Sequence, residues 1–359
     1  MNWSRRFGSA ALAIVAALLV ATGLMLLVNA PPLEAFNLLV KGSIGSTRKL
    51  SDTMMAWVPL MLTSAGLVIT YTAGLWNIGV EGQVIAGAIA ASYVARTVDG
   101  SIWLLIVLTM IAGMIGGAVW ALFAGVLKVF GRVNEIFGGL GLTFVAQALA
   151  TYLIIGPWKR AGIASTSGTD PFPEHAWLPT FAGTRLSLVA VGIGILAVVF
   201  VFFLLRGTRY GLRLKAVGRN SKSAFLLGIP TTRYMLSAFA LGGALAGLAG
   251  TVQVTGFLHK LVPAVSGGYG YLGILVALLV NLSAMWVPAV AFFFAMISVG
   301  STQLQLRLNL DSSLGGVLQG ILVLFTLLAQ GFQTRRGERV ETTAQAPPTT
   351  AQAAPTGGN

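Results

Sequence analysis

A single carboxylate, Glu81, lies inside the long apolar stretch "TAGLWNIGVEGQVIAGAIAASYVA" at residues 72–95. Charged side chains are rare in hydrocarbon, and those that occur usually face a polar path or a partner group within the protein. The sequence predicts that Asn77 caps a helix start here, and the positive end of that helix would favour an anion nearby. Two roles for Glu81 stay open: it braces the helix start, or it borders a polar path or its inner gate.

Other polar side chains within the apolar segments are candidates to line the same path. The path candidates are Asn77, Glu81, Gln83, Gln147, Gln253, Tyr271 and Asn281. Polar residues in spans also join neighbouring helices, with a stabilisation of about 0.6 kcal/mol on average, and that reading stays open for each of them. The sequence predicts no second ionisable residue inside a span, which argues against a carrier driven by protons.

Catalytic and metal-binding constellations are not evident in the sequence. The chain has no cysteine, and both histidines, His175 and His259, fall in predicted outer loops. No close pair of carboxylates and no Ser-His arrangement appears, and the phosphate-binding pattern G-x-x-x-x-G-K-[ST] does not occur. We therefore expect no catalytic residues, no metal site and no cofactor in this chain.

The composition indicates that the elements carrying these residues lie in a lipid bilayer. Of 359 residues, 56% are hydrophobic and 9% are charged, whereas an ordinary soluble domain has roughly 25% charged residues. The mean hydropathy of +0.83 agrees with this reading. The sequence predicts an all-α integral membrane protein.

Ten apolar segments approach the length of about 20 residues that a helix needs to cross a bilayer. They cover residues 9–28, 54–73, 77–95, 102–127, 136–156, 186–205, 236–256, 268–282, 284–301 and 313–331. The break at 281–286 is short, so nine spans are the alternative. The segment 206–235 holds seven Lys or Arg and no acid, and this bias favours ten spans with both termini cytoplasmic. It also accounts for the net charge of +13 without nucleic acid.

Spans 2–5 and 7–10 lie five membrane crossings apart. Because this number is odd, the two units would have opposite orientations and form an inverted repeat. The glycine-interrupted starts "GLWNIGVEGQ" and "SGGYGYLG" then occupy equivalent places, a pattern that often marks a translocation site. We expect one transmembrane domain at 1–333 and a disordered cytoplasmic tail at 334–359, which has few apolar residues to bury.

The segment 206–235 contains the parts of a short amphipathic helix. Asn220 or Ser221 can cap its start, Phe225 belongs to its apolar face, and Gly228 with Pro230 can end it. Such a helix suits either a partner protein or anionic headgroups at the membrane surface.

"AGLWNIGVEGQ" and "YGLRLKAVGRNSKSAFLLGI" resemble the permease subunits of bacterial ABC importers in the branched-chain amino acid/simple sugar permease superfamily. The similarity is greatest to nucleoside-type permeases that work with basic membrane lipoprotein-like receptors. The resemblance implies a multi-pass permease in the bacterial inner membrane that imports a small polar solute, a nucleoside first and a simple sugar next. It implies as partners a cytoplasmic ATPase, which holds the ATP and Mg, a second homologous permease and an extracytoplasmic substrate-binding lipoprotein. An ion-coupled secondary transporter is the alternative.

The resemblance also implies that the basic segment couples the permease to its ATPase. The residues concerned are Gly211, Arg213, Ala216, Val217, Gly218, Asn220, Ala224, Gly228 and Ile229. The chain departs from the family pattern at "IFGGLGLTF", residues 136–144, where the family usually has a "VI.T.MLN" element. If that helix lines the path, the solute differs from a nucleoside.

Overall fold

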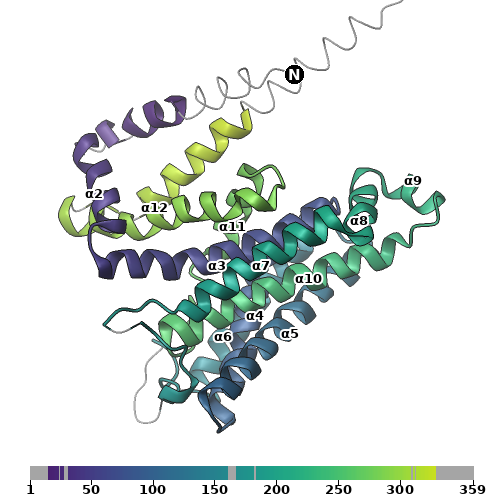
Figure 1. The fold of residues 1–359 in the computed structure, drawn as a ribbon, viewed down its shortest axis with the longest axis horizontal. Helices are drawn as coiled ribbons and strands as arrows, with labels where there is room; N and C mark the ends of the chain where they lie inside the picture. Colours follow the sequence, from purple (N-terminus) through teal and green to yellow (C-terminus); the bar gives the residue numbers. More distant parts are fainter. Residues whose placement is uncertain are drawn as a thin grey trace, which may run out of the picture.

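The computed structural model describes residues 15–23, 25–27, 31–160, 167–181, 183–308, 310–311 and 313–328. Within these ranges the protein is built from helices and connecting segments and contains no β-strand (Figure 1). The predicted tail and residues 9–14, 24 and 28 of the first predicted span lie outside the described residues. The all-α prediction is therefore confirmed for the part of the chain that the structure describes.

Six helices of the described chain are long and apolar enough to cross a membrane, and a seventh span is possible if the bent pair at 15–27 and α2 is one span. They are α3 (Thr47–Thr72), α5 (Ile102–Val129), α6 (Glu135–Ile155), α7 (Leu188–Gly207), α10 (Thr231–Val252) and α12 (Val287–Leu308). The helix α10 continues into the π-helix η2 (Gln253–Leu258), and the short η3 (Ala284–Trp286) precedes α12. The count of ten spans stays a prediction.

The helices α3 and α10 form the centre of the bundle, and α10 packs against α3, α4 (Val80–Thr97) and α5. Small residues permit this packing: a Cβ added at Gly66 of α3 would lie 2.7 Å from the Gly242 carbonyl oxygen of α10. Helices in a membrane gain little from apolar burial against each other, so close backbone contact through small residues holds them together. These contacts fix the frame on which the polar residues sit.

Two segments differ from the predicted pattern. The predicted span at 268–282 contains only α11 (Tyr269–Leu279), whose 11 residues extend about 16 Å, roughly half of a bilayer core. Residues 29–53 are predicted as an outer loop, but they contain the helix α2 (Pro32–Ile44) and the first turns of α3. The last helix, Leu314–Leu328, is also short. Residues 280–286 separate α11 from α12.

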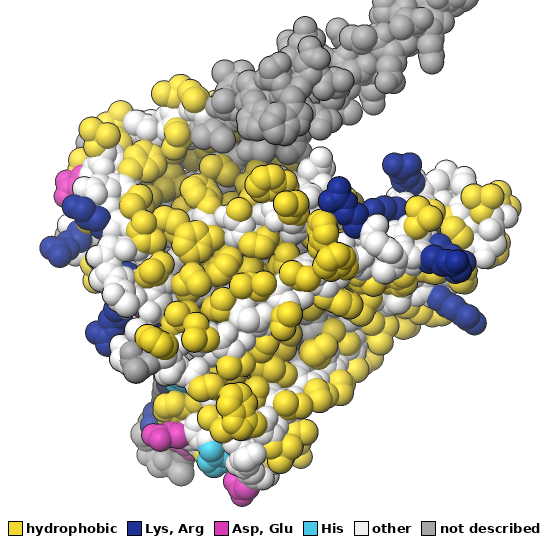
Figure 2. Space-filling view, in the orientation of Figure 1, with side chains coloured by type: hydrophobic (Ala, Val, Ile, Leu, Met, Phe, Trp, Pro, Cys, Tyr) yellow, Lys and Arg dark blue, Asp and Glu magenta, His cyan; other side chains and the backbone are white. Residues whose placement is uncertain are grey.

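The basic segment folds as two helices, α8 (Arg209–Arg219) and α9 (Ser221–Leu226), which project from one end of the bundle (Figure 1). We call this end the basic end. Figure 2 shows Lys and Arg side chains over α8 and α9 and also on the opposite side of the molecule, a broad hydrophobic band across the middle, and Asp, Glu and His side chains away from α8 and α9. This distribution suits a bundle whose middle lies in lipid.

Candidate functional site at the junction of two helix starts

Glu81 joins the start of α4 to the start of α11. Gly79 caps α4 without a side chain, and Glu81 follows in the first turn with 5% of its surface exposed. One carboxylate oxygen, Oε2, accepts hydrogen bonds from the backbone N–H groups of Gly270 at 2.7 Å and Tyr271 at 3.3 Å. The first N–H groups of a helix have no partner within the helix. Glu81 therefore supplies an acceptor to the unpaired N-terminal groups of α11.

This arrangement explains how a carboxylate is tolerated inside a bundle of apolar helices. The ion pairs found among the described residues do not include Glu81. Instead, the carboxylate lies in the first turn of α4 and beside the first turn of α11, and the N-terminal end of each helix carries a partial positive charge. The hydroxyl of Thr63 is 3.1 Å from the Tyr269 carbonyl oxygen, which places the start of α11 about 14 Å along α3 from its end at Thr72.

The absence of a side chain at Gly270 permits the close approach of α4 and α11. A Cβ there would lie 2.7 Å from the Glu81 Cα. On the other side of α4, a Cβ added at Gly79 would lie 2.9 Å from the Gly139 Cα of α6. The start of α4 is thus held between α6 and α11, and Gly139 is the residue of α6 that allows this approach.

Asn77 and Gln83 form a reciprocal amide pair beside this junction. Asn77 Nδ2 donates to Gln83 Oε1 at 3.0 Å, and Gln83 Nε2 donates to Asn77 Oδ1 at 2.8 Å. Both side chains are 1% exposed. The prediction that Asn77 caps the helix is wrong, because Gly79 is the cap residue and the Asn77 amide is already paired with Gln83. The pair closes the turn that leads into α4.

Two further glutamines lie along the segment that leads to α11. Gln147 Nε2 of α6 donates to the Pro263 carbonyl at 2.5 Å. Gln253 is buried in η2, and a Cβ added at Gly267 would lie 3.5 Å from its Nε2. The structure therefore places Asn77, Glu81 and Gln83 at the start of α4, and Gln147 and Gln253 beside the segment 259–268 that leads to α11.

Tyr271 and Asn281 lie at the two ends of α11. Tyr271 is 43% exposed, and Asn281 follows the end of α11 with a left-handed backbone (φ 47°). At the basic end, Asn281, Tyr71 and Trp76 line a cavity of about 230 Å³. The rings of Tyr71 and Trp76 lie 5.3 Å apart. Asn281 is thus separated from Glu81 by the length of α11, and the other candidates do not surround it.

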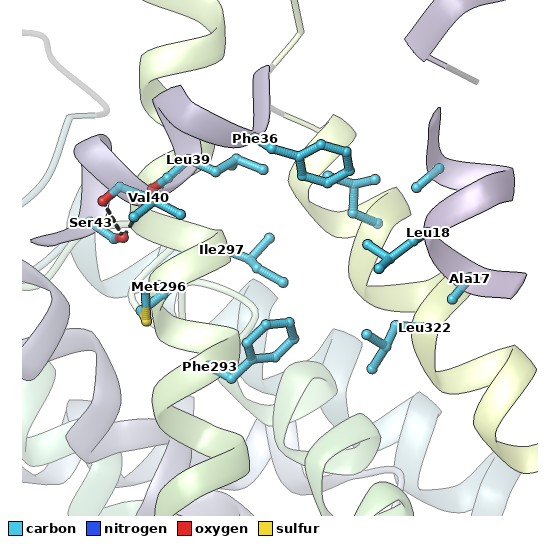
Figure 3. A pocket seen from close by; sticks show the side chains of 12 residues that line it. Ala17, Leu18, Phe36, Leu39, Val40, Ser43, Phe293, Met296, Ile297 and Leu322 are labelled. Carbon is cyan, nitrogen blue, oxygen red and sulfur yellow. Dashed lines mark hydrogen bonds between the residues drawn. The ribbon is translucent and has the colours of Figure 1, made fainter. Parts of the chain in front are cut away.

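A second cavity, of about 180 Å³, lies between residues 15–27, α2, α12 and the last helix. Figure 3 shows Phe293 and Ile297 of α12 facing Leu18 and Leu322 across it. The hydroxyl of Ser43 at its edge already donates to the carbonyl of Leu39. The lining offers no unengaged polar group to a polar solute, so this cavity does not compete with the α4–α11 junction.

The helices α8 and α9 present a separate surface. Asn220 caps α9, because its side chain accepts a hydrogen bond from the Ser223 N–H at 3.0 Å. Of the two predicted cap residues, Asn220 and Ser221, the structure therefore selects Asn220. Gly228 follows the helix with φ 79°. Ala224 is buried, whereas Phe225, Leu226 and Leu227 are 67%, 84% and 80% exposed. We call these three residues the apolar tip.

The other residues predicted for coupling support the positions of α8 and α9. Gly211, Val217 and Ala224 are buried, and Arg213 donates to the Tyr234 hydroxyl at 3.3 Å. A Cβ added at Gly218 would lie 3.0 Å from the Gly74 N atom. Ala216, Asn220, Gly228 and Ile229 lie in α8 or in the turns on either side of α9.

The sequence did not indicate that the first N–H groups of α11 are the partners of Glu81. Gly270 and Tyr271 lie 189 and 190 positions away. The glycines in "SGGYGYLG" were the available signal. Two of them, Gly267 and Gly268, have positive φ values of 57° and 75°, which is a conformation that glycine adopts without strain.

Comparison with known proteins shows the family to which the chain belongs. Residues 50–327 match the family described as branched-chain amino acid transport system / permease component. The chain is 32% identical to the glucose ABC transporter permease protein TsgB13 of Haloferax volcanii, covering 92% of this chain and 89% of that protein.

Two further relatives are permeases named for nucleosides. The chain is 26% identical to the guanosine ABC transporter permease protein NupP of Bacillus subtilis, over 88% of this chain and 91% of that one. It is 27% identical to the nucleoside ABC transporter permease protein NupB of Lactococcus lactis, over 84% and 85% respectively. The chain belongs to the branched-chain amino acid transport system permease family, as a multi-pass ABC transporter permease similar to nucleoside and sugar permeases.

Proposed function

We propose that this chain is the membrane-spanning permease of an ATP-driven importer and translocates a small polar solute. The solute is delivered by an external binding protein, and the energy comes from a separate cytoplasmic ATPase. A second homologous permease completes the path. In this proposal the basic end is cytoplasmic, ten spans place both termini there, and spans 2–5 and 7–10 form an inverted repeat.

The observation that carries the proposal is the apolar tip on α9. Its three large side chains are exposed, and α8 and α9 around them carry Lys and Arg side chains (Figure 2). Exposed apolar groups bounded by polar residues are typical of protein interaction sites. An ATPase seated on α9 would cover the tip, and the surrounding cations would favour an acidic rim on that partner.

The contacts of α8 suggest how motion of the ATPase reaches the path. Gly218 of α8 packs on the backbone of Ala73 and Gly74. The turn that begins at Gly74 leads through Asn77 into α4, where the Gln83 amide pairs with Asn77 and Glu81 lies in the first turn. Glu81 in turn holds the start of α11. A shift of α8 would therefore move the α4–α11 junction, which we propose as the inner gate.

The names of the relatives support a nucleoside as the solute, with a simple sugar as the second candidate. Two of the three relatives above are named for nucleosides or guanosine, and the one with 32% identity is named for glucose. The Gln253 amide suits either class, because both carry hydroxyl groups that donate and accept hydrogen bonds, whereas Asn77, Gln83 and Gln147 already hold partners within the protein.

The test is uptake by proteoliposomes that contain this chain together with candidate ATPase, second permease and binding-lipoprotein subunits from the same organism. Guanosine, uridine and glucose are offered as labelled solutes, with and without ATP. We expect ATP-dependent uptake of a nucleoside. Leu226→Asp is expected to abolish uptake while the variant elutes and melts as the unmodified protein, and Leu33→Asp, at an 87% exposed position of α2 away from the basic end, is the matched control.

Two results would contradict the proposal. If Leu226→Asp folds normally and retains full uptake, the apolar tip is not the coupling surface. If the purified chain alone accumulates solute in response to an ion gradient, it is a secondary transporter. Uptake of glucose but not of guanosine or uridine would replace only the nucleoside assignment.

A further inference from the structure

A groove at the basic end has the chemistry of a phosphate site. It has a volume of about 240 Å³ and lies where α7 ends, beside α8 and the turn before η3. Arg206 and Lys215 line it, together with Ser283. Thr72 and Phe202 belong to its walls. No carboxylate lines this groove.

The two cations of the groove are not neutralised by the protein. The ion pairs within the described ranges of the chain include neither Arg206 nor Lys215. The recorded partner of the Arg206 guanidinium is the ring of Phe202, 5.4 Å from its centre. Arg206, Lys215 and the Ser283 hydroxyl are all exposed, so they can donate to one anion. Guanidinium and ammonium groups donating to phosphate make strong, charge-assisted hydrogen bonds.

The groove also lies at the depth of a lipid headgroup. On α7, Leu196, Phe200 and Phe203 are 67%, 49% and 61% exposed, and their spacing of four and three residues places them on one face. Arg206 lies three residues after Phe203, on the same face of α7 and at the basic end. Across the groove, Trp286 of η3 is 60% exposed, and Trp is enriched where a bilayer meets water.

From these observations we infer that the groove binds the phosphate of an anionic phospholipid in the leaflet at the basic end. The headgroup lies between Arg206 and Lys215, and an acyl chain follows the exposed face of α7. Basic pockets between membrane helices are suited to such headgroups. The inference is independent of the transported solute and of the ATPase.

The experiment is native mass spectrometry of the full chain released from detergent with added phosphatidylglycerol or phosphatidylcholine of identical acyl chains. We expect the protein to retain phosphatidylglycerol in preference to phosphatidylcholine. Arg206→Gln and Lys215→Gln should each lower the retained fraction about five-fold, the effect of one basic residue near an anionic headgroup. The matched control is Lys222→Gln, which removes a cation of α9 outside the groove.

A second arm separates a lipid from a free phosphate ion. Excess inorganic phosphate should leave the phosphatidylglycerol bound, because the acyl chain contributes to binding. Equal retention of the two lipids, equal loss in Lys222→Gln and Arg206→Gln, or displacement by inorganic phosphate would overturn the inference. Melting curves of all variants in detergent confirm that the compared proteins are folded, since all three substituted side chains are exposed.

Discussion

Replacement of Glu81 by alanine tests the contact that joins α4 to α11. The substitution removes the acceptor of the Gly270 and Tyr271 N–H groups, and a buried donor without a partner costs about 1–3 kcal/mol. Because Tyr271 is partly exposed and its bond is longer, we expect a total loss of about 3 kcal/mol. Glu81→Gln keeps one acceptor oxygen but loses the charge, which roughly halves the strength of the bonds, so about 1 kcal/mol should be lost.

The assay is the free energy of unfolding of the purified chain in mixed micelles, titrated with a denaturing detergent. Glu34→Gln is the matched control, because Glu34 is an exposed carboxylate in the first turn of α2. Its effect should stay within about 0.5 kcal/mol. If Glu81→Ala unfolds like Glu34→Gln while transport is lost, Glu81 lines the path and does not brace α11. That result would refute the reasoning.

Two further predictions concern the packing of α6 and of His259. Gly139→Val should destabilise the chain by at least about 2 kcal/mol, because a Cβ there would lie 2.6 Å from the Gly79 N atom; Gly141→Val, which meets open space, should unfold within about 1 kcal/mol of the unmodified chain. His259 stacks on Trp177 with ring centres 4.0 Å apart, and burial lowers the pKa of His259 below its ordinary value of 6.5. His259 therefore binds a proton more readily in the unfolded chain than in the folded chain. The folded chain should keep the stability that His259 contributes above pH 6.5 and lose it as the pH falls below 6.5. Melting temperatures across that range should fall less in His259→Gln, and an equal fall in both proteins would contradict the prediction.

The sequence was sufficient to identify Glu81 and the basic segment as unusual. A lone acid in an apolar run and seven cations without an acid are local signals, and their physical cost does not depend on the rest of the fold. The cap at Asn220 was likewise predictable from the residues beside it. These features lie where the sequence placed them.

The partners of these residues were not predictable, because they come from distant parts of the chain. Glu81 meets Gly270, which is 189 positions away, and hydropathy alone does not show that α11 is only half a span. Asn77 had a plausible local role as a cap, but its side-chain amide instead forms two hydrogen bonds with the buried amide of Gln83. In the basic segment, cap and stop residues indicated one short helix, whereas packing of Gly211 and Gly218 against neighbouring backbone also supports α8.

The most direct test of the proposed function is cross-linking between the apolar tip and the ATPase. The chain contains no cysteine, so Leu226→Cys introduces a single thiol at an 84% exposed position. Leu33→Cys, which is 87% exposed on α2, provides the control away from the basic end. We predict that a short thiol-to-amine cross-linker joins the ATPase to the Leu226→Cys variant, and that ATP changes the yield. Cross-linking from Leu33→Cys alone, or from neither position in a complex that transports solute, would contradict the account.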